Sequence, residues 1–171
     1  MAAKLYGADN APLKIQFITD PHYYSRKGGT EGKAYEKAEA KSQKIIKDSD
    51  LVIKAGFDLL CADTSTDIVV LAGDTTRDGE LASHAEFIEM LRDLKKRGKR
   101  VYVITATHDY RDGGVAAGYD GDKKIQVPAV EERHDLWQMY YEFGPNEAIA
   151  THPDSMSYVV QLAPGYRLFA L

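Results

Sequence analysis

Three short polar clusters in this chain contain the residue types that bind metal ions and transfer protons. They are Asp20-Pro21-His22, Gly73-Asp74 and Thr107-His108-Asp109, and each follows an apolar run. Carboxylate oxygens and imidazole nitrogens are ligands that hard-to-borderline divalent cations prefer in proteins. A histidine in such a place can also protonate a leaving oxygen. The three clusters together therefore indicate a divalent-metal site with an acid–base group beside it.

The first cluster has a spacing that suits two ligands on one ion. Pro21 favours an extended backbone at Asp20. In an extended chain the side chains of residues i and i+2 point the same way. Asp20 and His22 are therefore predicted to face a common point. The alternative is a turn at the end of a strand, in which His22 caps or packs.

The second cluster places a carboxylate after a glycine. Gly73 lets the backbone bend, and the two oxygens of Asp74 can bridge two cations. For an isolated Gly-Asp pair, an N-cap of the following helix is the commoner role. Asp78 and Glu80 suit the N-terminus of that helix, and Asp78 has the alternative of orienting a catalytic group.

The third cluster could supply the acid–base chemistry. His108 could protonate a leaving oxygen or bind a phosphoryl oxygen, and the adjacent Asp109 could hold its tautomer. A histidine in this position alone is more often structural. The hypothesis gains its strength from the occurrence of all three clusters at equivalent places.

Those places are the ends of three predicted strands. The apolar runs 14–19, 67–72 and 100–106 are typical of central strands buried on both faces. Helical patterns occupy 34–62 and 80–97, with Gly98 as the stop of the second. This order predicts a parallel sheet with right-handed crossovers. Chemistry in such a sheet collects at the carboxyl ends of the strands.

The second half of the chain has a different pattern. Residues 110–130 are rich in Gly and Asp and are predicted to be a long loop, followed by a helix over 130–143. The runs 157–162 and 166–171 flank Ala163-Pro164-Gly165 and predict a β-hairpin. The last run has no turn after it, so we expect the fold to continue beyond this sequence.

Composition narrows the class of protein. The 171 residues are 44% hydrophobic and 28% charged, which is typical of a globular domain. No run is long enough to span a membrane, and one cysteine, Cys61, cannot form an internal disulfide. Cys61 is predicted to be a small buried hydrophobe. A net charge of −4 makes nucleic acid an unexpected partner. Oligomeric state stays open; a cytoplasmic location is the default, and export with a removed signal is the alternative.

In order, these clusters resemble the D-x-H, G-D and G-N-H-D signatures of calcineurin-like metallophosphoesterases. The resemblance spans roughly Ile15 to Tyr110, and Gly73 to Glu80 (GDTTRDGE) is similar to the bacterial members. It implies an α/β fold, a four-layer αββα sandwich. This chain would hold the first sheet with its helices and the start of the second. Residues 1–171 would then be the N-terminal portion of one domain, truncated before the C-terminal histidine motifs.

The resemblance also implies roles for individual residues. Asp20 and His22 would bind the first metal, Asp74 would bridge both metals, and His108 would contact the phosphoryl group. Thr107 stands where the family has an asparagine that binds the second metal, and the later G-H-x-H block is absent. His134 and His152 do not fit that block and are predicted to lie on the surface. We expect two divalent ions (Mn, Fe or Zn) in a complete protein, and one weakly bound ion or none here.

The implied activity is hydrolysis of a phosphate mono- or diester by a metal-bridged hydroxide. The expected substrate is a small phosphorylated molecule. We expect this chain by itself to have little activity. Tyr23 and Arg26 could contact that substrate, although a solvated loop is the commoner reading of residues 22–33. One rival is a nuclease of the same superfamily, for which the basic cluster in residues 95–100 is the candidate groove. The other rival is a non-catalytic binding module with a degenerate metal site.

Overall fold

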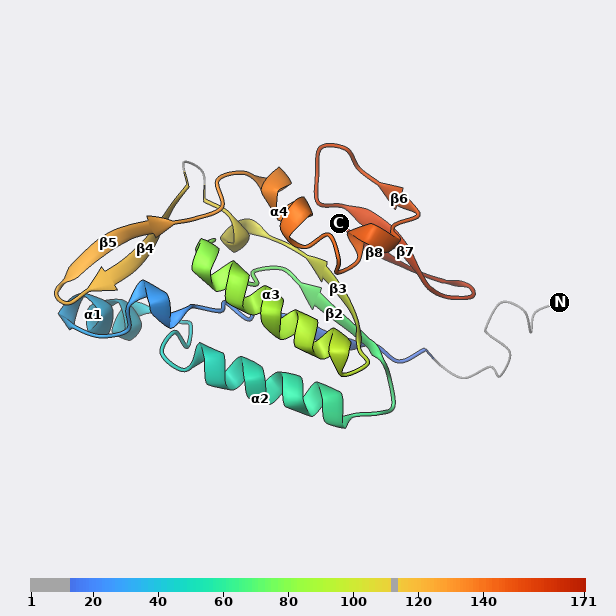
Figure 1. Cartoon of the computed structure of the whole chain (residues 1–171), viewed down its shortest axis with the longest axis horizontal. Coiled ribbons are helices and arrows are strands. Elements are labelled where there is room, and N and C mark those ends of the chain that lie inside the picture. The colour runs from blue at the N-terminus through green and yellow to red at the C-terminus, as the bar shows by residue number, and fades with distance from the viewer. Residues whose placement is uncertain (1–12, 112–113) are drawn as a thin grey trace.

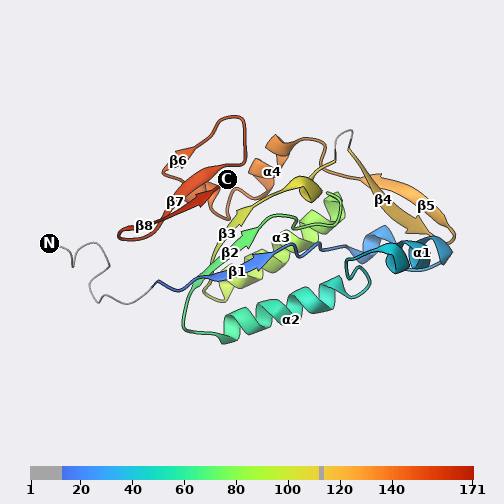
Figure 2. The same ribbon diagram turned by 180° about the vertical axis from the view of Figure 1, so that it is seen from behind.

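A three-stranded parallel sheet forms the centre of the molecule. The computed structural model describes residues 13–111 and 114–171. Strands β1 (Gln16–Thr19), β2 (Ile68–Ala72) and β3 (Arg100–Ile104) lie in the order β1-β2-β3. Figure 1 shows β2 and β3 side by side, and Figure 2 shows all three strands. The predicted parallel sheet is therefore confirmed, and the chain has a mixed α/β fold.

Helices α2 (Ser49–Ala62) and α3 (Leu81–Lys96) cover one face of this sheet (Figure 2). Helix α3 ends before Gly98, which has φ +92° as expected for a residue that follows a helix. The helical pattern 34–62 is divided between α1 (Lys33–Lys41) and α2. The division comes at Ser42, whose extended backbone and side-chain bond to the N–H of Lys44 compete with helix continuation.

Alternation along the central strands creates two cores. Val69, Leu71, Val101 and Val103 are buried against the helices. Ile68, Val70 and Tyr102 point the other way and pack against a second, antiparallel sheet. That sheet contains β6 (Ala150–Thr151), β7 (Tyr158–Ala163) and β8 (Tyr166–Ala170). The first sheet therefore lies between a helical layer and a second sheet.

One strand differs from the prediction of burial on both faces. β1 is at the edge of the described sheet, and its side chains alternate between partly buried and exposed. Phe17 is 61% exposed. The run 14–19 is apolar enough to form a strand, but its outer face has no described layer over it.

The prediction of a long loop over residues 110–130 is wrong for most of that range. Residues Val115–Asp120 (β4) and Lys123–Pro128 (β5) form an antiparallel hairpin. Gly121 and Asp122 make its two-residue turn, in which Gly121 has φ +56°. Tyr119 of this hairpin packs with Tyr24 and Tyr35, so that hairpin and α1 together form one end of the molecule (Figure 1).

The C-terminal elements agree more closely with expectation. Helix α4 (Arg133–Met139) is shorter than the predicted 130–143 but lies within it. The hairpin of β7 and β8 is confirmed, with a turn at Pro164 and Gly165. The two-residue strand β6 was not predicted, because a strand of that length has no pattern.

The predicted exposure of two histidines is confirmed, whereas the predicted burial of Cys61 is only partial. His134 and His152 are exposed, as predicted, whereas Cys61 is only partly buried, because it lies toward the edge of the helical core.

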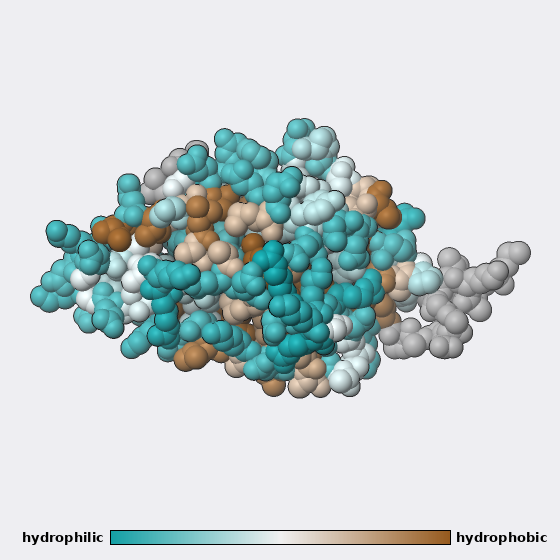
Figure 3. All heavy atoms as spheres, viewed as in Figure 1, coloured by the Kyte–Doolittle hydropathy of each residue, from teal (hydrophilic) through white to brown (hydrophobic). Residues whose placement is uncertain are grey.

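Hydrophilic side chains cover much of the face drawn in Figure 3. Among residues 13–111 and 114–171, no helix combines the length and the apolar character that a membrane crossing requires.

The basic cluster at residues 95–100 is largely engaged within the molecule. Lys95 Nζ donates to the carbonyl of Glu142, and Lys99 Nζ donates to the carbonyls of Asp63 and Thr66, each at 2.6–2.7 Å. Arg97 pairs with Asp58 at 2.7 Å. These contacts agree with a cationic helix C-terminus.

Candidate metal centre

Asp20, His22 and Asp74 converge beyond the carboxyl ends of β1 and β2. Each offers a ligand atom, and the three atoms lie within 4.8 Å of one another. His22 Nε2 is 3.9 Å from Asp20 Oδ1 and 3.8 Å from Asp74 Oδ2. In the part of the chain that the structure describes, this is the one cluster of three such residues.

The backbone that brings them together is not extended. Asp20, His22 and Asp74 have φ values of +51°, +44° and +47°, so the extended geometry predicted for Asp20 is wrong. Left-handed conformations of residues other than glycine cost about 1–3 kcal/mol each and cluster at functional sites. The convergence predicted from an extended chain is thus reached by a different, more strained route.

Hydrogen bonds between two loops maintain this conformation. The N–H groups of Asp20, His22 and Tyr23 donate to the carbonyls of Gly73, Asp74 and Thr75, at 3.2, 3.0 and 2.9 Å. The loops that follow β1 and β2 are therefore joined residue by residue. Through these bonds the sheet register fixes the positions of the three ligand side chains.

Asp74 is held by the third cluster and does not cap a helix. Its Oδ1 accepts a hydrogen bond from the N–H of His108 at 3.0 Å, which leaves Oδ2 facing His22. Helix α3 begins only at Leu81, and Glu80 occupies its N-cap position. The alternative of an N-cap role for Asp74 is therefore excluded.

His22 has the form and orientation of a metal ligand. Its Nδ1 lies 3.3 Å from the carbonyl of Thr76 and can donate to it, which directs Nε2 toward both carboxylates. Burial lowers the pKa of His22, and the positive charge of Lys44 lowers it further. The neutral imidazole, which is the form that binds metals, is thereby favoured.

The spacing of the three donors fits one small divalent ion. Bonds of ~2.0–2.2 Å place two ligand atoms on a common ion about 3–4 Å apart. Both distances from His22 are inside this range. Asp20 has a side chain that is 60% exposed, so a small rotation can bring its oxygen toward Asp74. Two carboxylates and a neutral imidazole are a suitable set for Mn, Fe or Zn.

His108 lies beside this group with its own set of partners. Its ring meets the His22 ring edge-on, with centroids 5.0 Å apart. Nδ1 is 2.7 Å from the carbonyl of Arg77 and 3.1 Å from Asp78 Oδ1. Lys44 Nζ lies 3.2 Å from the same nitrogen. Burial lowers the pKa of Lys44, while the carboxylates of Asp78 and Asp74 oppose that shift.

Asp109 has a structural position, in contrast to its predicted role beside the His108 ring. Its carboxylate is fully buried and accepts hydrogen bonds from Thr75 Oγ1, from the N–H and hydroxyl of Thr76, and from the N–H of Ala106. These bonds join the loops after β2 and β3. Asp78, whose carboxylate also pairs with Arg111, takes the place next to the His108 ring.

Buried His84 supports the same loop and has a structural role. Nδ1 is 2.7 Å from the hydroxyl of Tyr140, and Nε2 is 2.8 Å from the carbonyl of Asp109. Burial lowers the pKa of His84. The histidine inside α3 therefore fixes the loop that carries His108 without reaching the metal ligands.

The structure does not bring Tyr23 and Arg26 to the site. Tyr23 is buried, its hydroxyl donates to Glu86 at 2.7 Å, and burial raises its pKa. Arg26 pairs with Asp50 at 3.3 Å. Both line a separate pocket over α2 and α3. The chain turns inward at Tyr23 to pair with the loop after β2, and the Arg26 side chain points to Asp50, so neither side chain lies with the three metal-ligand candidates.

Three polar residues near His108 were not assigned to the site from the sequence. Lys44, Arg77 and Arg111 surround Asp78 and the His108 ring. Lys44 comes from the turn between α1 and α2, and nothing in its lysine-rich segment distinguishes it.

Thr107, the predicted ligand of a second metal, is exposed at the start of a short 3-10 helix, Thr107–Asp109.

Gly73 is expected to be required for this geometry. Its φ is +81°, and a Cβ added there would lie 2.8 Å from the Cβ of Ala106. We expect Gly73→Ala to lower the free energy of unfolding by about 1–3 kcal/mol. The matched change Gly56→Ala in α2, where a Cβ meets nothing within 4 Å, should raise it by about 0.5–1 kcal/mol. Urea denaturation of both variants measures the two effects; a Gly73→Ala protein as stable as the unmodified chain would contradict this reading of the loop.

Two comparisons with known proteins gave no match. No protein-family model matches the chain, and no curated protein matches it.

Proposed function

We propose that this chain carries the metal-binding strand ends of a calcineurin-like metallophosphoesterase and that its activity is hydrolysis of a phosphate ester. The observation that supports this most directly is the approach of Asp20, His22 and Asp74 to within 4.8 Å. The second sheet against β2 and β3 is consistent with the start of the αββα sandwich of that family.

A divalent ion between these ligands would lower the pKa of nearby water and neutralise charge on a phosphoryl group. Asp20 and Asp74 supply negative oxygen ligands, and His22 supplies Nε2 with its ring fixed by Thr76. The N–H of His108 holds the Asp74 carboxylate in place. The protein's part is to keep these donors preorganised, so that little rearrangement is required at the moment of reaction.

His108 is proposed to deliver a proton to the leaving oxygen. Nδ1 can donate to the Arg77 carbonyl, and the Asp78 carboxylate 3.1 Å away helps to hold the ring in this orientation. Nε2 is then the nitrogen from which a proton can be transferred. Asp78 would act as the positioning residue that the sequence allowed as an alternative.

Lys44 is proposed to bind a phosphoryl oxygen next to His108. In the described residues, Asp20, His22 and Asp74 make up one metal-ligand group, and Thr107 is not part of it. The ammonium of Lys44 lies 3.2–3.4 Å from the two ring nitrogens of His108. A fixed positive charge there can neutralise part of the negative charge on the phosphoryl group, a task that a fully coordinated second ion would otherwise perform.

The non-catalytic binding module is the rival that this site leaves open, since one ion is enough for recognition or folding. The nuclease is less well supported, because Lys95, Arg97 and Lys99 bind groups of the protein itself. Turnover with metal separates the enzyme from the module.

The test is hydrolysis of p-nitrophenyl phosphate and bis(p-nitrophenyl) phosphate with added Mn²⁺. We expect slow hydrolysis that EDTA abolishes and that excess Mn²⁺ restores. His22→Ala should reduce it at least about 100-fold, since even a partner of a metal ligand contributes about 10–100-fold. His134→Ala, which removes an exposed histidine, should leave it unchanged. Hydrolysis of neither ester with Mn²⁺, Fe²⁺ or Zn²⁺ would favour the module.

A further inference from the structure

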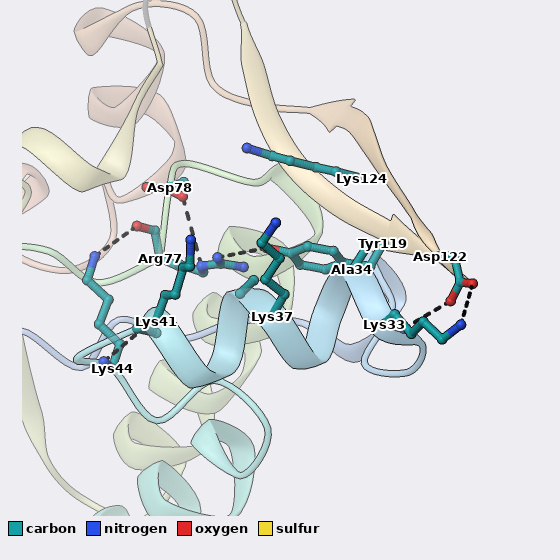
Figure 4. A pocket seen from close by; sticks show the side chains of 12 residues that line it. Lys33, Ala34, Lys37, Lys41, Lys44, Arg77, Asp78, Tyr119, Asp122 and Lys124 are labelled. Atoms are coloured by element: carbon teal, nitrogen blue, oxygen red, sulfur yellow. Dashed lines mark hydrogen bonds and ion pairs between the residues drawn. The ribbon is translucent and has the colours of Figure 1, made fainter.

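A basic pocket of about 770 Å³ lies beside the candidate metal centre, between α1 and the β4–β5 hairpin. Figure 4 shows side chains from both elements and from the loop after β2 around it. Six cationic residues and two carboxylates line this pocket; the cations are Lys33, Lys37, Lys41, Lys44, Arg77 and Lys124. This local positive charge occurs in a protein whose net charge is −4.

The lysines of α1 form a line along the pocket. Lys33, Lys37 and Lys41 are four residues apart, which places them on one face of the helix. Like charges at this spacing repel one another. Lys33 pairs with Asp122 at 3.7 Å, whereas Lys37, Lys41 and Lys124 have no ion pair among the described residues. An anion in the pocket would remove this repulsion.

Arg77 adds a partly buried cation to the pocket. Its guanidinium stacks near the rings of Tyr24 and Tyr119, at 5.2 and 5.6 Å, and donates to the hydroxyl of Tyr119 at 2.9 Å. Its NH1 group is buried and has no hydrogen-bond partner in the part of the chain that the structure describes. Buried donors are normally paired, so this one indicates a place for an acceptor.

The pocket joins the metal centre on the side of His108. Lys44, Arg77 and Asp78 line the pocket, and the same three residues contact the His108 ring. The lysine line continues away from His108 along α1 for about 12 Å, at ~1.5 Å per residue. A leaving group that accepts a proton from His108 would therefore extend into the basic pocket.

We infer that this pocket binds a second phosphate group of the substrate. The substrate class is then a phosphate ester whose leaving group carries at least one further phosphate, held by Lys37, Lys41, Lys124 and Arg77. This inference rests on the proposed function, because it uses His108 to set the direction of the leaving group.

Anion binding can be measured without catalysis. In the Asp74→Asn protein with EDTA, titration calorimetry with inorganic tripolyphosphate and with orthophosphate compares a chain of phosphates with a single one. We expect tripolyphosphate to bind at least about tenfold more tightly, since each added charge contact multiplies affinity severalfold. Lys37→Gln/Lys41→Gln should remove most of this advantage.

Matched control variants distinguish anion binding by the pocket lysines from a general effect of the protein's net charge. Lys54→Gln/Lys96→Gln removes two exposed charges elsewhere and should leave tripolyphosphate binding unchanged. Lys124→Gln should weaken it, while Lys123→Gln, the next residue on β5 and outside the pocket lining, should not. Equal effects of the pocket and control variants, or equal affinity for both anions, would overturn the inference.

A kinetic comparison connects the pocket to the substrate. With Mn²⁺, fructose 1,6-bisphosphate should show a KM at least about tenfold below that of fructose 6-phosphate, and Lys37→Gln/Lys41→Gln should abolish the difference. Equal KM values in the unmodified protein would overturn the assignment of the pocket to substrate. If neither ester is hydrolysed while lysine-dependent tripolyphosphate binding persists, the proposed function fails and the anion pocket stands.

Discussion

Asp74→Asn is expected to reduce the affinity for Mn²⁺ by more than about 100-fold and to abolish metal-dependent hydrolysis. Even residues that only support a metal ligand contribute about 10–100-fold, and Asp74 would be a ligand itself. An asparagine keeps the size of the side chain and an oxygen that can accept from the N–H of His108. It removes the negative charge that faces His22 Nε2 at 3.8 Å. The loss should therefore come from metal binding, with the fold retained.

Asp58→Asn is the matched control for this change. Asp58 is an exposed carboxylate on α2 that pairs with Arg97, far in sequence from the ligand loops. Calorimetric titration with Mn²⁺ and the rate of p-nitrophenyl phosphate hydrolysis should be unchanged in this variant. An Asp74→Asn protein that binds Mn²⁺ as tightly as the unmodified chain would exclude Asp74 as a ligand.

Asp109→Ala is expected to lower the free energy of unfolding by about 3 kcal/mol or more. The change leaves the buried N–H of Thr76 and the partly buried N–H of Ala106 without their acceptor, and it removes the shorter of the two hydrogen bonds of the Thr75 hydroxyl. Each buried group left unpaired costs about 1–3 kcal/mol. For a protein of this size, 3 kcal/mol corresponds to a fall in Tm of roughly 6–12 °C. Urea and thermal denaturation measure the effect.

Asp78→Ala distinguishes a structural from a catalytic carboxylate. Asp78 is partly exposed, and Arg111, which pairs with it, is 40% exposed and can reach water, so the loss of stability should be about 1 kcal/mol or less. Its effect should appear instead in kcat, through the position of His108. An Asp109→Ala protein with unchanged stability and lost activity would return Asp109 to the role first expected for it.

The elements that the sequence predicts best are those with continuous apolar runs. β2 and β3 are buried on both faces, so Ile68 to Leu71 and Val101 to Val103 need apolar side chains at every position. That requirement leaves a pattern which can be recognised without the structure. The carboxyl ends of neighbouring parallel strands share one edge, and for this reason the convergence of Asp20, His22 and Asp74 was predictable.

The elements that were missed depend on contacts between distant parts of the chain. The β4–β5 hairpin has an almost wholly exposed strand, Lys123–Pro128, in which the only apolar alternation is the short pair Ile125 and Val127. Its one local signal, Gly121-Asp122, is typical of a two-residue hairpin turn with glycine in the first position. The positive φ of Asp20 follows from hydrogen bonds to Gly73, a residue more than fifty positions away. No local rule for an Asp-Pro pair contains that information.

Three predicted site residues have side chains that point away from the metal-ligand candidates and the His108 ring, for the same reason. Tyr23 and Arg26 follow the ligands in sequence, but Tyr23 turns inward to Glu86, and Arg26 turns to Asp50. Asp109 is next to His108 in sequence, yet its side chain is directed into the interior. Adjacent residues in a turn point in different directions, so proximity in sequence does not assign them to one site.

The most direct test of the metal centre is a crystal of this protein grown with Mn²⁺, with anomalous diffraction collected near the Mn absorption edge. We predict one anomalous peak between Asp20 Oδ1, His22 Nε2 and Asp74 Oδ2, at about 2.0–2.2 Å from each atom. Crystals with millimolar Mn²⁺ that show no peak at these three side chains, or a peak only at another place, would contradict the account.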